Sequence, residues 1–321
     1  MEEAKKKKKF ELSGNLSILL GLIVLCVFFS ISSDRFLTLG NFVNLMLQVS
    51  SIAIVSIGGL FVILTGGIDL SAGSMAAFIG LLMAGFCVDN GMPVPAATGL
   101  GILIGIGLGY LIGLSVTKLR LTAFIVTLAM QSMLRGLALV YSQGTTIYGM
   151  PESFNVVGGG MIGSIPVPVI LVIVLFLVSH FVLSKTTFGH EVYAVGGNRE
   201  AAYLAGINVK RVERITYTIA GGMTALAALV ITGRLGAAVP DAADGLEFSA
   251  ISAIVIGGGS LAGGKGNMLG TFIGVLIIGV LNNGLNLLNV SPFWSKFAQG
   301  LIIFVAVLID AISQRRAQEK A

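Results

Sequence analysis

Few side chains in this sequence have the type and spacing that catalysis or cofactor binding requires. Gly259 to Lys265 reads G-x-x-x-x-G-K, the start of a phosphate-binding loop, but Gly266 follows where a Ser or Thr hydroxyl must hold magnesium. His180 and His190 lack a nearby cluster of carboxylates or cysteines, so neither a metal site nor a hydrolytic triad is expected. The sequence predicts no catalytic residues, no metal site and no bound cofactor.

The composition predicts a membrane protein. Only 11% of the 321 residues are charged and 55% are hydrophobic, whereas a soluble chain is about 25% charged. Several uncharged runs reach the roughly 20 residues that a helix needs to cross hydrocarbon. The 44 glycines fit close helix packing in lipid. Cys26 and Cys87 lie inside apolar runs, which gives no support to a disulfide framework.

The expected fold is an all-α polytopic membrane protein of about ten helices with an internal repeat, forming a single transmembrane domain over residues 1–321. A basic tail (1–13), a long polar excursion (185–212) and a C-terminal tail (312–321) lie outside the spans. The predicted spans are 14–32, 40–64, 72–89, 95–117, 121–142, 165–184, 213–233, 248–262, 268–288 and 294–311.

The distribution of positive charge predicts the orientation. With the N-terminus inside, 16 of the 20 Lys and Arg residues fall in cytoplasmic segments and three fall outside, which is a strong positive-inside pattern. Lys5 to Lys9 precede the first apolar run, and no cleavage site follows, so an uncleaved first span is expected. Both termini are therefore placed in the cytoplasm. The net charge of +5 reflects this topology and does not indicate nucleic-acid binding.

The segment GGNREAAYLAG, residues 196 to 206, predicts a short helix in the largest cytoplasmic excursion. Asn198 can cap its start, Glu200 lies near the positive end of the helix dipole, and Gly206 can cap its end. Ala202, Leu204 and Ala205 are available for packing. Two turns of helix are not stable alone in water. From spacing alone, the covering surface could be a partner protein or the chain's own spans.

Four stretches of the sequence resemble one family of transport proteins. EAAYLAG resembles the EAA-x-x-x-G signature of permease subunits of bacterial ATP-binding-cassette importers, in which a short cytoplasmic helix docks into a cleft of the ATPase subunit. Residues 64–74, 257–274 and 281–288 extend the similarity to monosaccharide permeases like the ribose permease. One departure is that NVKRVERITYT follows Gly206 without the Leu-Pro of the general signature.

This resemblance implies a transport subunit and not an enzyme. The chain would pass a monosaccharide inward across the bacterial cytoplasmic (inner) membrane. An extracytoplasmic sugar-binding protein would deliver the sugar, a cytoplasmic ATPase would use ATP and magnesium, and a second permease copy, identical or different, would complete the complex. The residues implied in ATPase coupling are Gly196, Gly197, Asn198, Arg199, Glu200, Ala201, Ala202, Leu204, Ala205 and Gly206.

Three alternative functions are considered. A branched-chain amino acid permease of the same class would need helix N-termini or cations facing the substrate carboxylate. A secondary transporter driven by an ion gradient predicts intramembrane carboxylates, and the deep parts of the predicted spans carry none. A membrane enzyme would need a cluster of His, Asp or Cys at a membrane face, and the sequence shows no such cluster.

Two glycine-rich turns suggest the internal repeat. The stretch that starts at Gly66 aligns with the stretch that starts at Gly257, and each opens a helix on the cytoplasmic side. Asp69 is expected to cap the third span, with a gating or ATPase contact as the alternative. The candidate turn or gating glycines are Gly66, Gly67, Gly257, Gly258, Gly263 and Gly264.

Polar residues inside the spans are candidates for the translocation pathway. Arg135 in the fifth span either faces a wet interior or extends to the outer headgroups, and Gln131 shares its face. The amide side chains of two other spans serve either interhelical hydrogen bonds or the pathway; they are Asn44, Gln48, Asn282, Asn283 and Asn286. Phe293 and Trp294 are expected to anchor the chain at the outer interface.

Overall fold

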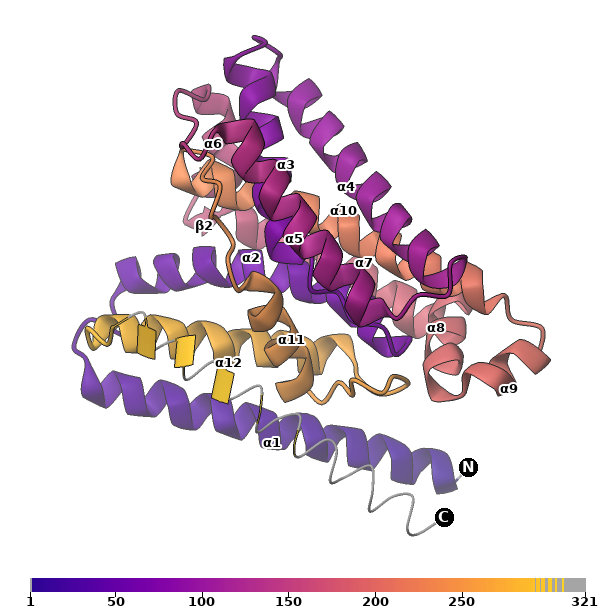
Figure 1. Ribbon diagram of the computed structural model, residues 1–321. Coiled ribbons are helices and arrows are strands. Elements are labelled where there is room, and N and C mark those ends of the chain that lie inside the picture. Colours follow the sequence, from indigo (N-terminus) through magenta and orange to yellow (C-terminus); the bar gives the residue numbers. More distant parts are fainter. Residues whose placement is uncertain are drawn as a thin grey trace.

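The computed structural model describes residues 2–291 together with 293, 294, 296, 297, 300, 301, 304 and 308, with the backbone alone for residues 2–14. This part of the chain is built from helices (Figure 1), which confirms the all-α prediction. The helices are α1 (Glu2–Ser32), α2 (Leu39–Leu64), α3 (Ala72–Val88), α4 (Val94–Thr117), α5 (Ala123–Ser142), α6 (Glu152–Gly159), α7 (Val167–Lys185), α8 (Thr187–Gly197), α9 (Arg199–Leu204), α10 (Val209–Leu235), α11 (Leu246–Ile256) and α12 (Met268–Leu287). A small hairpin, β1 (Met161–Ile162) with β2 (Ile165–Pro166), precedes α7.

Seven helices in the described residues are long and apolar enough to cross a membrane. They are α2, α4, α5, α7, α10, α12 and the Asn15–Ser32 part of α1. Two further predicted spans, 72–89 and 248–262, correspond to shorter helices. They are α3, of 17 residues, and α11, of 11 residues. The predicted span 294–311 lies mostly outside the described residues. About ten full spans are therefore not confirmed.

The span predicted at 248–262 is wrong in extent. The helix α11 ends at Ile256, and three consecutive glycines follow it. Gly258 has a φ of 88°, a left-handed conformation that stops a helix and that glycine adopts without steric cost. At 1.5 Å per residue, α11 is about 16 Å long, roughly half of the hydrocarbon thickness.

The central element is α10, which packs against α2, α3, α4 and α6. The Asn208 side chain accepts a hydrogen bond from the Arg211 N–H at its start, and Gly236, in the left-handed conformation, follows its last turn. Helix α10 therefore lies between α2 on one side and α3 and α4 on the other (Figure 1).

A stripe of glycines allows α4 to approach α10 closely. Gly105, Gly109 and Gly113 recur every four residues and so lie on one face of α4. A β-carbon on Gly109 would overlap the Tyr217 carbonyl oxygen, and one on Gly113 would lie 2.9 Å from the Arg214 Cα. Backbone contact at this distance is how membrane helices gain packing energy without a hydrophobic force between them.

The chain between α2 and α3 turns back into the protein. Thr65 lines a cavity with Glu213 and Tyr217 in the first turns of α10. Further along, the Ile68 carbonyl accepts a hydrogen bond of 3.2 Å from the Tyr217 hydroxyl, and Asp69 lines a small cavity with Thr224. Residues 65–71 therefore run beside α10 towards its middle, and α3 begins there, inside the molecule.

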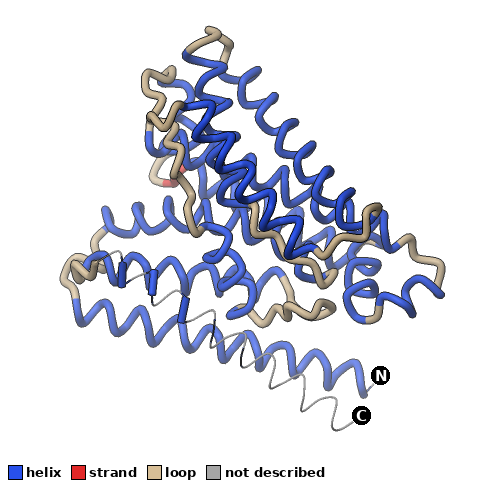
Figure 2. The backbone as a smooth tube through the Cα atoms, viewed as in Figure 1, coloured by secondary structure: helices blue, strands red, loops and turns tan. Residues whose placement is uncertain are grey.

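The chain between α10 and α11 turns back from the other end. Residues 236–245 leave the last turn of α10 and descend to α11 without regular structure, as Figure 2 shows. At Ala238 this segment forms an isolated β-bridge with Ile147. Glu247, in the first turn of α11, lines the same small cavity as Thr224. Both turning segments, 65–71 and 236–245, therefore end near the middle of α10.

The first turns of α3 and α11 meet at this point. A β-carbon on Gly73 would overlap a carboxylate oxygen of Glu247 and the carbonyl oxygen of Ala243. The two short helices run in opposite directions from this contact, α3 towards the α5 end that holds Tyr141 and α11 towards Gly270 at the start of α12. Irregular backbone at membrane depth is tolerated when protein surrounds it, as it does here.

The glycine stripe on α4 gives a test of the packing. Gly109→Ala places a methyl group against the α10 backbone, and overpacking of this kind costs about 1–3 kcal/mol. We expect a lower midpoint of thermal unfolding for the detergent-solubilised protein. Gly107→Ala is the matched control, because a β-carbon there meets nothing within 4 Å. Equal stability of the two variants would contradict the proposed packing.

Candidate coupling and translocation sites

The segment 196–206 forms the end of one helix and the whole of the next. Gly196 and Gly197 are the last residues of α8, and Asn198 begins α9. The Asn198 Oδ1 accepts hydrogen bonds from the backbone N–H groups of Glu200 (3.1 Å) and Ala201 (2.9 Å). This is the N-cap that the sequence predicted, and it fixes the start of a six-residue helix.

Gly206 ends α9 as expected. Its φ is 85°, and its N–H donates to the Tyr203 carbonyl while the Ile207 N–H donates to the Ala202 carbonyl. This pair of bonds is the Schellman motif, which satisfies the last carbonyl groups of a helix. The capping hydrogen bonds at both ends stabilise α9, although it has only six residues.

Two large apolar side chains of α9 are exposed, beside the exposed Arg199 and Glu200 at its start. Tyr203 is 71% exposed and Leu204 is 79% exposed. Ala202, by contrast, is buried against the chain's own helices, which is one of the two coverings that its spacing leaves open. Helix α9 projects at one end of the molecule, near the start of α1 (Figure 1). Tyr203 is not among the residues predicted for coupling, although it directly precedes Leu204 in the sequence.

An ion pair connects α9 to α10. The Arg199 Nη2 lies 2.9 Å from the Glu213 Oε2, and the Glu213 side chain is only 10% exposed. A nearly buried carboxylate needs a charged partner, and Arg199 supplies it. The coupling segment predicted from the sequence includes Arg199 but not Glu213, which lies 14 residues further along the chain and carries no local signal of this role.

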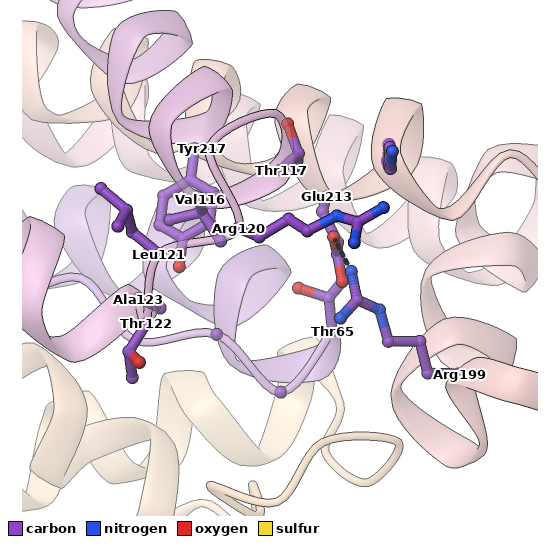
Figure 3. Close-up of a pocket in the computed structure, with 13 residues that line it drawn as sticks. Thr65, Val116, Thr117, Arg120, Leu121, Thr122, Ala123, Arg199, Glu213 and Tyr217 are labelled. Atoms are coloured by element: carbon purple, nitrogen blue, oxygen red, sulfur yellow. Dashed lines mark hydrogen bonds and ion pairs between the residues drawn. The ribbon is translucent and has the colours of Figure 1, made fainter.

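A cavity of about 460 Å³ opens beside this ion pair. Figure 3 shows the Arg120 side chain extending towards Glu213, which is bonded to Arg199. The cavity is lined by residues of four segments: Thr65, Gly66, Gly67, Val116, Thr117, Arg120, Leu121, Thr122, Ala123, Arg199, Lys210, Glu213 and Tyr217. Three cations and one carboxylate make it a positively charged, polar space at the α9 end of the protein.

The glycine-rich turns meet at this end too. The Gly264 N–H donates a hydrogen bond of 2.9 Å to the Leu64 carbonyl, and a β-carbon on Gly263 would lie 2.8 Å from the Gly66 nitrogen. A β-carbon on Gly196 would overlap the Leu64 carbonyl. The two turns are therefore on the same side, as predicted, and α8 packs against both.

The remaining candidate turn glycines differ in role. Gly258, Gly263 and Gly264 have positive φ, as Gly66 does. Gly67 and Gly257 do not, and they are needed for space, because a β-carbon would meet the Tyr217 hydroxyl and the Gly270 backbone respectively. The phosphate-loop-like stretch is a closed turn, since the Ser260 N–H donates to the Lys265 carbonyl.

Two candidate pathway residues on α5 bind the segment before α11. Arg135 donates hydrogen bonds to the carbonyl oxygens of Pro240 and Ala242. The Gln131 Nε2 donates to the Glu247 Oε1 at 3.0 Å. Arg135 therefore faces the protein, and the alternative that it extends to the outer headgroups is wrong.

Asp69 does not cap α3. Its Oδ1 accepts hydrogen bonds from the Ser71 N–H (2.9 Å) and the Ser71 hydroxyl (2.6 Å), and Ser71 itself is the N-cap residue. Asp69 lies two residues before that position, so its carboxylate closes a turn instead of binding the helix N–H groups. This leaves Asp69 beside the small cavity that also contains Glu247.

Two carboxylates at the edges of predicted spans are buried in the protein. Glu213 is 8% exposed and Glu247 is 2% exposed. Both stand at the edge of an apolar run in the sequence, where a charged residue normally marks a boundary with water. Their partners, Arg199 and Gln131, come from other segments, so no local pattern indicates that these carboxylates are buried.

The amide candidates separate into two groups. Asn283 and Asn41 exchange two hydrogen bonds, of 3.0 and 2.8 Å, between α12 and α2, so Asn283 serves helix packing and not the pathway. Asn44 and Asn286 are exposed, and Asn282 is half-buried. The Oε1 of Gln48 is buried and has no partner in the described part of the chain.

A second ion pair joins the segment before α11 to Lys296. The Lys296 Nζ lies 2.9 Å from the Asp244 Oδ2, and both side chains are more than half exposed. Phe293 and Trp294 are also exposed here, at 83% and 64%. Within the described residues, no three His, Cys, Asp or Glu side chains group as metal ligands would.

Comparison with known proteins identifies the family. Residues 41–307 match the profile of the family described as branched-chain amino acid transport system / permease component. No solved structure shows significant similarity to the chain.

Three named relatives cover almost the whole sequence. They are the ribose import permease protein RbsC of Bacillus subtilis (44% identity; 95% of this chain, 96% of the relative), the D-allose transport system permease protein AlsC of Escherichia coli (38%; 97% and 96%) and the L-arabinose ABC transporter permease protein AraH of Azospirillum brasilense (36%; 97% and 92%). The chain is thus a transport component without catalytic function of its own, and it belongs to the family of ABC importer permeases that includes these proteins.

Proposed function

We propose that the chain is the membrane-spanning subunit of an ATP-driven importer that translocates a monosaccharide, ribose or a related sugar. The observation that carries this proposal is the similarity to permeases named for three different monosaccharides, each over more than nine-tenths of both chains. No metal or cofactor of this chain takes part, and the partner ATPase hydrolyses the ATP.

Helix α9 is proposed as the contact with that ATPase. Its caps fix its geometry, and Tyr203 and Leu204 form an exposed apolar surface that suits a protein cleft. The Arg199–Glu213 ion pair and the packing of Ala202 connect this surface to the first turns of α10. A movement of the ATPase would therefore reach α10 through a short, stiff path.

The proposed contact implies an orientation in the membrane and a set of partners. The α9 end faces the cytoplasm with both termini, in the bacterial cytoplasmic membrane, and the opposite end, with α6, faces the sugar-binding protein. The positive lining of the cavity at the α9 end agrees with the positive-inside rule. A second permease copy completes the transporter, and the number of permease chains in the purified complex tests this.

The proposed translocation pathway passes the buried polar groups of α5. Gln131 and Arg135 bind the segment 236–245 and the start of α11, so they are placed to respond when these elements move. Gln48, Asn44, Asn282 and Asn286 are kept as secondary candidates on α2 and α12. Alternating access would open the two ends of the pathway in turn.

Import of a branched-chain amino acid is the second candidate, favoured by the description of the family profile. It would need a positive group free to bind the substrate carboxylate. The half-buried cation of α5, Arg135, uses its Nη1 for hydrogen bonds to two backbone carbonyl groups. The relatives named for three monosaccharides favour the neutral sugar.

Uptake into proteoliposomes decides between the two substrates. The permease is reconstituted with the ATPase and the binding protein of its own operon, and radiolabelled ribose, allose, arabinose or leucine is supplied. We expect ATP-dependent uptake of one of the sugars and none of leucine. Uptake of leucine alone would replace the proposal with the amino acid function, and uptake of sugar without ATP would contradict an ATP-driven importer.

A substitution on α9 tests the coupling contact. Leu204→Asp places a charge on the exposed apolar surface, and loss of an interface anchor costs about 2 kcal/mol, or roughly thirtyfold in affinity. We expect ATP-driven sugar uptake and copurification of the ATPase to fall together. Lys118→Glu, an exposed residue at the same end, is the control. Normal uptake by the Leu204 variant would exclude α9 as the docking site.

A further inference from the structure

The cavity beside the Arg199–Glu213 ion pair carries more positive than negative charge. Its volume of about 460 Å³ lies within the range of small-molecule sites. The charged side chains of its lining are Arg120, Arg199, Lys210 and Glu213. Arg199 is paired with Glu213, whereas neither Arg120 nor Lys210 has an ion-pair partner in the described part of the chain. Two positive charges of the lining are therefore not neutralised by the protein.

Arg120 approaches the ion pair from the turn between α4 and α5. Its φ is 55°, a left-handed conformation that is uncommon for residues other than glycine. Its side chain extends towards Glu213, to which Arg199 is already bonded (Figure 3). Two guanidinium groups from distant segments thus lie near one carboxylate, and that carboxylate can neutralise only one of them.

The start of α5 adds backbone donors to the same lining. Leu121, Thr122 and Ala123 line the cavity, and the 20-residue helix begins at Ala123. The first N–H groups of a helix have no partner within the helix. The side chain of the N-cap residue Thr122 makes no capping hydrogen bond to them. The positive end of the α5 dipole therefore lies at a cavity that already has an excess of cations.

We propose that this cavity binds a phosphate ester. A phosphate monoester carries close to two negative charges at neutral pH, which matches the two cations that lack a partner. Its oxygens accept the forked N–H donors of an arginine and the N–H groups at a helix N-terminus. Glu213 does not exclude the anion, because Arg199 neutralises it. A soluble sugar phosphate and the headgroup of an anionic lipid both supply this chemistry on the proposed cytoplasmic side.

A bound phosphate would connect the coupling segment to the start of α5. Arg199 is the first residue of α9, which packs against α8 and α10, and Arg120 precedes α5. An anion between these two side chains would restrain α9 relative to α5 and would oppose a movement delivered by the ATPase. The filled site is therefore expected to slow import. This consequence rests on the proposed function, whereas the binding itself does not.

Binding is measured with the complete importer in phosphatidylcholine nanodiscs, by equilibrium dialysis of radiolabelled ribose 5-phosphate at physiological ionic strength. We expect saturable binding with one site per permease chain. Arg120→Gln and Lys210→Gln should each weaken it about tenfold, the loss of one hydrogen bond between charged groups. Arg120→Lys, which keeps the charge but loses the fork, should weaken it less. Lys118→Gln, an exposed cation outside the lining, is the matched control and should bind normally.

Sugar uptake distinguishes the two sources of phosphate. In phosphatidylcholine proteoliposomes, ribose 5-phosphate on the ATP side should slow wild-type uptake about fivefold, the lower end of usual coupling between two sites. Arg120→Gln, compared with its own rate without the ester, should be slowed much less. If a lipid headgroup is the occupant, phosphatidylglycerol in the membrane slows the wild type, displaces the labelled ester and has little effect on Arg120→Gln.

Three results would overturn the site. The first is no saturable binding of the ester together with uptake that does not respond to phosphatidylglycerol. The second is binding that Arg120→Gln and Lys210→Gln both leave unchanged; where Arg120→Gln fails to assemble, Arg120→Lys replaces it. The third is binding by the permease alone that disappears when the ATPase is added, because an acidic side chain of the ATPase then fills the cavity. A wild-type importer that binds the ester but takes up no sugar contradicts the proposed function and leaves the site standing.

Discussion

Backbone hydrogen bonding inside a membrane is the constraint on which this structure depends. Residues 65–71 and 236–245 are not helical, and their N–H and C=O groups would be costly to expose to lipid. The protein accommodates them by running both beside α10 and by binding them with side chains. Tyr217 donates to the Ile68 carbonyl, and Arg135 donates to the carbonyl oxygens of Pro240 and Ala242. These few bonds make it possible for α3 and α11 to begin in the interior of the molecule.

Helix α10 connects the features that bear on function. Its first turns carry Glu213 and Tyr217, which line the large cavity at the α9 end. One turn and two turns further, Ala220 and Thr224 line the small cavity with Asp69 and Glu247. All four residues lie on one face at helical spacing. A displacement of α9 that reaches Glu213 through Arg199 would therefore act on the same helix face that borders the buried carboxylates.

The sequence was informative wherever the determining interactions are local. The caps of α9 follow from Asn198 and Gly206, and most helix ends follow from charges and glycines within a few residues. The sequence failed where burial is decided by distant contacts. Glu247 meets Gln131 across 116 residues, and Arg135 meets Pro240 across 105, so no local pattern could reveal either. Hydropathy also overestimated α11, since residues 257–262 are apolar enough for a span but too rich in glycine to stay helical.

The contact of α8 with the two glycine-rich turns is made largely by backbone, together with one side-chain hydrogen bond from the Tyr193 hydroxyl to the Gly266 carbonyl. A β-carbon on Gly196 would overlap the Leu64 carbonyl, and one on Gly264 would lie too close to the Gly197 backbone. One amide hydrogen bond, from Gly264 to Leu64, joins the two turns. Side chains can adapt to a shift by changing rotamer, but peptide planes in direct contact cannot. The three segments must therefore move together as one rigid unit. A residue inserted in either turn would separate these backbone contacts, so the lengths of the two turns depend on each other.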